Sequence, residues 1–174
     1  MGMAVKYVTR VRSKFWEANR LKPDTSSDTM VSMTWDPTEG QTGPGDALSA
    51  FSGGPAASKC RSDFALEGKK AYNRVIEQLF PGYVTNATAS VFMNWPGIPW
   101  TMAGYCFPSP GQITRVGPIL RKGIGKLHFA GEHTCFKFVG YMEGALNSGV
   151  SLANRLAGSH AIASWGPAEI GGAE

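Results

Sequence analysis

Residues that could hold a metal ion or a ligand gather in one run, 128–149. His128, Glu132 and His133 are types that bind zinc, but their spacing fits no zinc-protease helix motif. Residues 127–130, Leu-His-Phe-Ala, are mostly apolar, which predicts a buried strand rather than a helix. We therefore predict no metal site in this run.

The same run predicts a strand that ends at Gly131 and Glu132, followed by a glycine-rich helix over 140–156 that Gly158 stops. Within that helix, small residues share one face: Gly144, Ala145, Ser148 and Gly149. Each internal glycine costs about 1 kcal/mol relative to alanine. A small-residue face permits either tight packing of the helix or the close approach of a flat ligand. The spacing leaves both interpretations open.

Composition excludes several classes of protein. The 174 residues are 43% hydrophobic and 17% charged, typical of a globular domain and not of a disordered chain. A net charge of +4 without a basic block argues against nucleic-acid binding. The apolar stretches are too short to span a bilayer. There is no signal-peptide pattern, and the three cysteines lack metal or redox spacing, so we expect reduced thiols and a cytoplasmic location.

Alternating residues over 4–16 predict a strand with two distinct faces. One face carries Val5, Tyr7, Thr9, Val11 and Ser13, and the other carries Lys6, Val8, Arg10, Arg12 and Lys14. Further strands are expected over 30–35, 47–51 and 87–95. A helix capped by Asp63 is expected over 63–80, and a short helix over 113–120 should be interrupted at Gly117-Pro118. The predicted class is α+β.

The run 128–149 resembles the flavin-contacting C-terminal motif of the FAD-dependent amine oxidase family. Three further stretches match this family in order: Lys6 to Trp16, Asn94 to Tyr105, and Cys106 to Gln112. The resemblance implies a partial substrate-binding domain over 1–104, with a mixed sheet and helices. It also implies the closing strand and helix of an FAD-binding α/β domain over 105–158, and a flexible tail over 159–174.

The resemblance also implies roles for individual residues. Lys6 would hold a water against flavin N5, where a cation stabilises negative charge; without the resemblance, Lys6 would be a solvated strand lysine. Trp100, Tyr105 and Tyr141 would contact the substrate, the two tyrosines as an aromatic cage. Gly104 stands where covalently flavinylated members have cysteine, so FAD would be non-covalent. The cofactor would contact Gly131, Glu132, Gly140, Tyr141 and Met142.

The implied reaction converts an amine or amino acid to an imine and reduces dioxygen to hydrogen peroxide, with FAD as the redox cofactor. The chain has no Gly-x-Gly-x-x-Gly motif for the dinucleotide. We therefore expect it to be inactive without an N-terminal FAD-binding half, supplied by a partner chain or within a homo-oligomer. The alternatives are a remnant that binds no flavin and a non-catalytic oligomerisation or binding domain derived from this fold.

Overall fold

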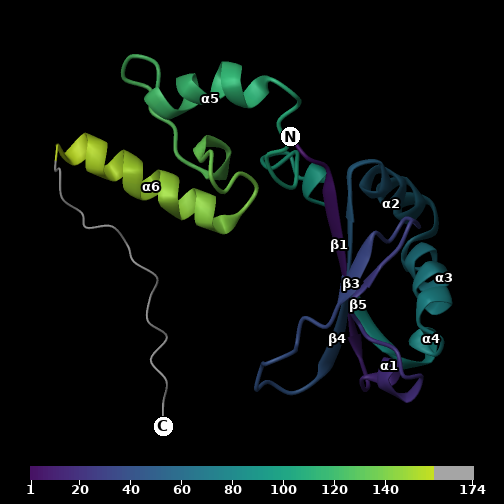
Figure 1. The fold of residues 1–174 in the computed structure, drawn as a ribbon. Helices are drawn as coiled ribbons and strands as arrows, with labels where there is room; N and C mark the ends of the chain where they lie inside the picture. Colours follow the sequence, from purple (N-terminus) through teal and green to yellow (C-terminus); the bar gives the residue numbers. More distant parts are fainter. Residues whose placement is uncertain (159–174) are drawn as a thin grey trace, which may run out of the picture. The chain divides into compact units, whose positions relative to one another are not determined.

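The computed structural model describes residues 1–158. Contacts between residues divide the chain into two units, the first Met1–Tyr105 and the second Cys106–Glu174 (Figure 1). In the described part of the chain, no helix is both long enough and apolar enough to cross a membrane. The tail predicted for residues 159–174 lies outside the described residues.

The first unit, unit 1, is built on a five-stranded sheet with the order β2-β3-β4-β1-β5. The strands are β1 (Ala4–Val11), β2 (Thr25–Ser26), β3 (Met33–Trp35), β4 (Asp46–Gly53) and β5 (Ala87–Met93). Every pairing is antiparallel, whereas we expected a mixed sheet. Strands and helices together confirm the predicted α+β class.

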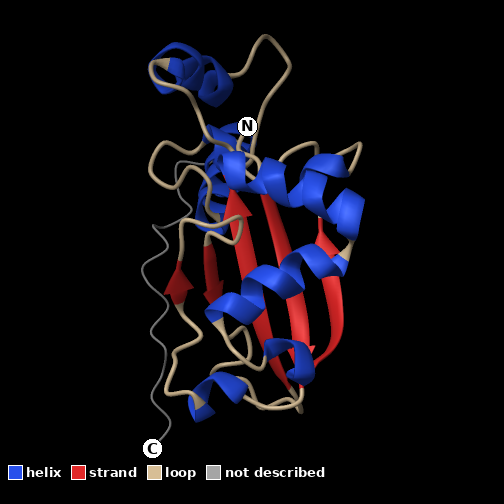
Figure 2. Cartoon of the chain, turned by 90° about the vertical axis from the view of Figure 1, so that its right-hand side faces the viewer, coloured by secondary structure: helices blue, strands red, loops and turns tan. Residues whose placement is uncertain are grey.

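The core of unit 1 lies on one face of the sheet, and β1 shows why. Its residues Val5, Tyr7, Thr9 and Val11 are buried, as their alternation predicts. Helices α2 (Gly54–Glu67) and α3 (Lys69–Leu79) lie across this face (Figure 2). The ring of Tyr7 stacks on that of Tyr72 from α3, with centroids 4.1 Å apart. The opposite face of the sheet carries Lys6 and is not covered by these two helices.

Two short helices, α1 (Phe15–Ala18) and α4 (Tyr83–Asn86), complete this core. Phe15, Trp16 and Tyr83 are buried in it, and the Tyr83 hydroxyl lies 2.7 Å from the Thr9 hydroxyl. Beyond β3, the buried Asp36 carboxylate accepts hydrogen bonds from Thr38 and pairs with Lys14 at 2.8 Å. Burial alone would raise the pKa of Asp36, but these bonds outweigh it and lower that pKa below its ordinary value.

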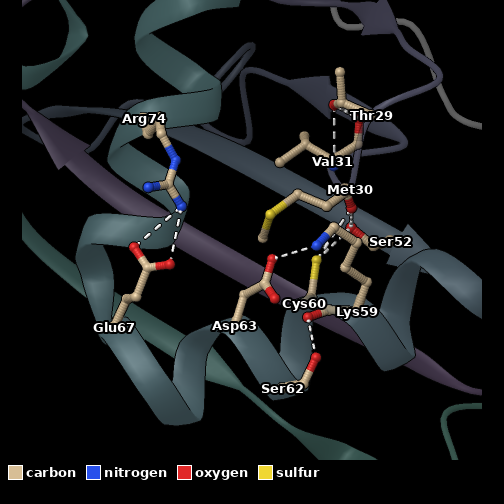
Figure 3. A network of polar contacts seen from close by, with 10 residues as sticks. All are labelled: Thr29, Met30, Val31, Ser52, Lys59, Cys60, Ser62, Asp63, Glu67 and Arg74. Atoms are coloured by element: carbon tan, nitrogen blue, oxygen red, sulfur yellow. Dashed lines mark hydrogen bonds and ion pairs between the residues drawn. The ribbon is translucent and has the colours of Figure 1, made fainter.

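The predicted helix over 63–80 is wrong in its start and its continuity. The helical segment begins at Gly54, with Pro55 in its first turn, and Gly68 at φ 61° divides it into α2 and α3. Proline is favourable in a first helical turn because it lacks only an N–H that has no helical acceptor there. Asp63 is not a cap: it lies inside α2 and pairs with Lys59 at 2.9 Å (Figure 3).

A small buried network ties α2 to the sheet (Figure 3). The Ser52 hydroxyl of β4 and the Cys60 thiol of α2 both donate to the backbone oxygen of Met30, at 2.6 and 3.1 Å. Burial raises the pKa of the Cys60 thiol, which stays protonated as a donor. These bonds satisfy polar atoms that would otherwise be costly to bury.

The second unit, unit 2, has two main helices, α5 (Gln112–Lys122) and α6 (Met142–Ala157). Helix α5 continues through Pro118, so the predicted interruption does not occur. Helix α6 ends at Gly158, whose φ of 64° is the left-handed stop that we predicted. Short 3-10 turns lie at η2 (Glu132–Thr134) and, in unit 1, at η1 (Trp95–Gly97).

The strand predicted over 127–130 is absent. The segment forms only an isolated bridge between Ile124 and Leu127, and Leu127 is 57% exposed. A strand is stable only when its backbone groups pair with a neighbouring strand. No other strand occurs among the described residues of unit 2. The apolar run therefore has the composition of a buried strand without the neighbours that would make it one.

Unit 2 also buries few side chains. Among its described residues only Thr134, Cys135 and Ser148 have buried side chains, together with two buried glycines. Large apolar side chains are exposed on both helices, including Ile113, Val116, Ile119, Leu146, Val150 and Leu156. Exposed apolar sets of this kind are typical of surfaces that contact other protein, a membrane or a ligand.

Candidate functional site

A pocket lies on the open face of the unit 1 sheet. We call it the unit 1 pocket; its lining residues are Ala4, Lys6, Met33, Trp35, Phe51, Trp95, Gly104 and Tyr105. Two predicted site residues, Lys6 and Tyr105, thus come together although 98 positions separate them in the chain. Trp100, the third candidate of this unit, is 96% exposed and does not line the pocket.

Strand register builds one wall of the pocket. Lys6 on β1 pairs with Phe51 on β4, and Phe51 pairs with Met33 on β3, which makes a row across three strands. Because side chains alternate along a strand, Trp35 projects on the same face as Met33. The Lys6 ammonium lies 5.0 Å from the centre of the Trp35 ring, within the range of a cation–π contact.

Tyr105 is held in place by a backbone bridge to the start of the chain. The Gly2 N–H donates to the backbone carbonyl oxygen of Tyr105 at 2.7 Å, and the Gly104 N–H donates to the backbone carbonyl oxygen of Gly2 at 2.8 Å. A Cβ on Gly104 would lie 2.4 Å from the Cβ of Ala4, so the close approach of Gly104 to Ala4 requires glycine. A side chain at position 104, including the cysteine of covalently flavinylated proteins, has no room here.

The neighbouring thiol of Cys106 offers no substitute for such a cysteine. Burial, and then the negative charge of Glu132, raise the pKa of the Cys106 thiol above its ordinary value. The thiolate is the reactive form of cysteine, so this environment suppresses nucleophilic reactions.

In unit 2, Glu132 connects two segments that are distant in sequence. One carboxylate oxygen accepts the Cys106 N–H and the other accepts the Gly140 N–H, both at 2.8 Å. Each oxygen has a second lone pair that can still accept a hydrogen bond from a hydroxyl group. Gly140, at φ 87°, turns the chain into α6. Glu132 therefore positions the start of this helix.

The small-residue face of α6 packs tightly where it is buried. The Ser148 hydroxyl accepts the Gly131 N–H at 2.9 Å and lies 2.9 Å from the Gly131 oxygen. A Cβ on Gly144 would lie 2.2 Å from the Phe138 oxygen. Of the two open interpretations, tight packing thus accounts for Gly144 and Ser148. Gly149 has no such neighbour, since a Cβ there would meet nothing within 4 Å.

The start of α6 presents its remaining candidates outward. Tyr141 is 70% exposed and Met142 is 88% exposed. The first N–H groups of a helix have no intrahelical acceptor and carry partial positive charge, so they favour an anionic or oxygen-rich group. Gly131 has φ 143°, and the space of its missing Cβ is taken by the His133 ring at 2.6 Å. Gly131, Glu132 and Gly140 thus form one connected structure at this helix end.

Sequence comparison shows to which family the chain belongs. The model of the family described as flavin-containing amine oxidoreductase matches residues 1–157. The chain belongs to this family. A flavin-containing amine oxidase of Oncorhynchus mykiss is 26% identical over 165 residues, which are 90% of this chain and 31% of the relative. A pseudooxynicotine dehydrogenase of a Pseudomonas species is 26% identical over 156 residues, 90% of this chain and 29% of the relative.

Solved structures of amine oxidases share the fold. Cyclohexylamine oxidase from Brevibacterium oxydans IH-35A matches with a TM-score of 0.76 and 24% identity, covering 90% of this chain and 36% of that one. Putrescine oxidase bound to putrescine matches with a TM-score of 0.79 and 18% identity, and the match covers 90% of this chain and 35% of that one. The chain spans about a third of the length of the curated relatives it matches.

Sequence reasoning missed most of the residues that line the unit 1 pocket, among them Met33, Trp35 and Phe51. Alternation within 30–35 would have placed Met33 and Trp35 on one face. Their position beside Lys6 depends on strand register, which pairs residues far apart in the chain. The aromatic cage of Tyr105 and Tyr141 stays a prediction, because the two residues belong to different units.

Proposed function

We propose that this chain is the flavin- and substrate-contacting C-terminal portion of an FAD-dependent oxidase. The reaction is oxidation of primary amines or amino acids to imines, with reduction of dioxygen to hydrogen peroxide. The observation that carries the proposal is the unit 1 pocket, where Lys6 and Tyr105 come together in a member of the flavin-containing amine oxidoreductase family. Lys6 would place a cation beside developing negative charge, and Tyr105 would form one wall of the substrate site.

The residues of unit 2 fit one end of FAD. The acceptor oxygens of Glu132 suit ribityl hydroxyls, and the first N–H groups of α6, with Met142, suit the carbonyl edge of a flavin ring. Tyr141, exposed beside them, is available to cover the ring. FAD, when bound, would supply the redox chemistry, and the protein would supply position and charge. The sequence holds no glycine-rich loop for the pyrophosphate, so other protein would bind that end.

Amines are favoured over amino acids as substrates. Recognition of an amino-acid carboxylate usually needs a guanidinium, which binds it with two parallel hydrogen bonds. No arginine is among the residues that line the unit 1 pocket, where Lys6 is the one cation. An L-amino-acid oxidase would therefore need its carboxylate clamp from residues outside this pocket.

A partner surface follows from the exposed apolar side chains of α5 and α6. We propose that an N-terminal FAD-binding half, in a partner chain or a second copy of this chain, covers them, and that the chain alone is inactive. The same exposed faces favour the second candidate, a non-catalytic oligomerisation or binding domain. A cytoplasmic location remains our expectation from the sequence.

Flavin content separates the two candidates. The chain would be expressed alone and with the FAD-binding N-terminal part of a family member, incubated with FAD, desalted, and examined for flavin absorbance and peroxide formation. We expect retained flavin and amine-dependent peroxide in the complex, and loss of both when Glu132→Ala weakens cofactor binding. A complex that forms without flavin would favour the non-catalytic domain and overturn the oxidase proposal.

A further inference from the structure

A second pocket lies within unit 2, and we call it the unit 2 pocket. Its volume is about 410 Å³, and its walls come from the end of α5, from residues 134–137 and from one side of α6. None of the residues that the resemblance assigned to the flavin lines this pocket. It therefore needs an explanation of its own.

Three cationic side chains line the unit 2 pocket, and they come from three separate segments: Arg121 of α5, Lys137 and Arg155 of α6. Arg155 is held in place because its guanidinium donates to the backbone oxygen of Arg121. The Arg121 guanidinium lies 6.0 Å from the centre of the Phe136 ring. Within residues 1–158, none of the three forms an ion pair with an acid. Like charges gathered at one cavity repel each other, and an anion bound there would remove that cost.

A neutral donor completes this set of groups. The Asn147 side chain also lines the pocket, and its oxygen accepts the Cys135 thiol at 3.5 Å. With the oxygen used in this way, the Asn147 NH2 group offers its two N–H donors to a ligand. Guanidinium, ammonium and amide N–H groups all donate, so they suit a ligand that carries several acceptor oxygens and negative charge. A phosphate group has both properties.

The remaining wall is apolar. Phe129, Phe136 and Leu152 line the pocket beside the cations, and the ring of Phe136 is 42% exposed. A ligand that consisted of phosphate alone would leave this wall in water. A flat or apolar organic group attached to the phosphate would cover it, since burial of apolar surface and ring-on-ring contact both favour binding.

The pocket and the flavin-facing start of α6 lie on opposite sides of this helix. Asn147, Ser151 and Arg155 are four residues apart, so they form one stripe along α6. At about 100° per residue, Met142 and the exposed Leu146 project roughly half a turn away from the centre of that stripe. Protein that covers the exposed apolar side of α6 would therefore leave the pocket open.

We infer that the unit 2 pocket binds a small phosphate monoester whose organic part is flat or apolar. Arg121, Lys137 and Arg155 hold the phosphate oxygens, and Phe129 with Phe136 contacts the organic part. The inference does not depend on the proposed function, because it concerns a site on the other side of α6 from the residues proposed to meet the flavin.

The test uses the 174-residue chain and phenyl phosphate as the probe, with amide chemical shifts followed by NMR. We expect saturable shifts at Lys137, Asn147 and Ser151, and an affinity that falls as salt is added. Phenol lacks the charge and inorganic phosphate lacks the ring, so each should bind at least about tenfold more weakly than phenyl phosphate.

A matched pair of variants assigns the binding to this pocket. Lys137→Gln removes one lining cation that forms no ion pair within residues 1–158, so it should weaken phenyl phosphate binding about tenfold without unfolding the chain. Lys122→Gln removes the same charge from an exposed position of α5 outside the lining and should leave the affinity unchanged.

Three results would overturn the inference. The first is the absence of shifts at the pocket amides in a chain with native circular dichroism. The second is phenol or inorganic phosphate binding as tightly as phenyl phosphate, or equal effects of Lys137→Gln and Lys122→Gln. The third is loss of phenyl phosphate binding in the complex with the FAD-binding half, which would show that FAD or an acidic segment of that half fills the pocket. None of these results bears on flavin retention or peroxide formation, which test the oxidase proposal separately.

Discussion

Replacing Glu132 with glutamine tests whether this residue holds the start of α6. The two carboxylate oxygens each accept one backbone N–H, from Cys106 and from Gly140. A glutamine side chain has a single acceptor oxygen, and its NH2 group would face the other N–H as a second donor. One of the two bonds must therefore break, although the size of the side chain is unchanged.

The expected cost follows from the kind of bond that is lost. A hydrogen bond to a charged group contributes about 1.5–3 kcal/mol. Glu132 is half-buried, so water would replace part of that contribution and about 1–2 kcal/mol should be lost locally. This corresponds to roughly 5- to 30-fold more frequent opening of the affected segment.

Amide hydrogen exchange followed by NMR measures this opening residue by residue. We expect faster exchange at Cys106 or Gly140 in Glu132→Gln, by the factor given above. Glu143→Gln is the matched control, because Glu143 lies in the first turn of the same helix and its removal changes only the charge there. Unchanged exchange at both amides, or equal acceleration in the control, would refute the reasoning.

Three further predictions concern stability. Gly104→Ala should destabilise unit 1 by about 1–3 kcal/mol in urea denaturation, because its Cβ would lie 2.4 Å from the Cβ of Ala4. Gly43→Ala is the control: its Cβ would meet nothing within 4 Å, so it should be neutral or slightly stabilising. Equal effects of the two substitutions would contradict the contact. Gly144→Ala should lower the thermal midpoint of α6, because its Cβ would lie 2.2 Å from the backbone oxygen of Phe138. Gly149→Ala, whose Cβ would meet nothing within 4 Å, should gain up to about 1 kcal/mol of helix propensity. A stabilised Gly144→Ala variant would show that the helix shifts freely. The pKa of Asp36 is lowered in the folded chain. Its contribution to the free energy of unfolding is therefore complete above the ordinary carboxyl pKa of about 3.9, and it is lost as pH falls through the folded pKa. Urea midpoints measured between about pH 5 and about pH 2 should fall less steeply in Asp36→Asn, and parallel curves for the two proteins would argue against the ion pair.

Local patterns in the sequence were informative where the physics is local. Alternation along 4–11 placed Tyr7 on the buried face of β1 and Lys6 on the other, because strand side chains alternate whatever the neighbours are. The left-handed stop at Gly158 follows in the same way from the backbone freedom of one residue. The family motif, likewise a run of adjacent residues, identified the amine oxidase relationship.

Features that depend on distant partners were decided by the tertiary structure. The apolar run at 127–130 has strand composition, but it pairs with no strand among the described residues of unit 2, and so it forms none. Gly68 takes a positive φ that divides α2 from α3, although the apolar periodicity runs across it. The place of Trp35 beside Lys6 follows from the register of β3, β4 and β1.

The sequence by itself thus determined the family, the strand faces and the residue types available for chemistry. The tertiary structure decided which of these residues meet. It brought Tyr105 to Lys6 through the bridge to Gly2, and it used both oxygens of Glu132 to position α6. The physical reason is that propensity and periodicity act between near neighbours in the chain, whereas register and hydrogen-bond partners are set by contacts between residues far apart in it.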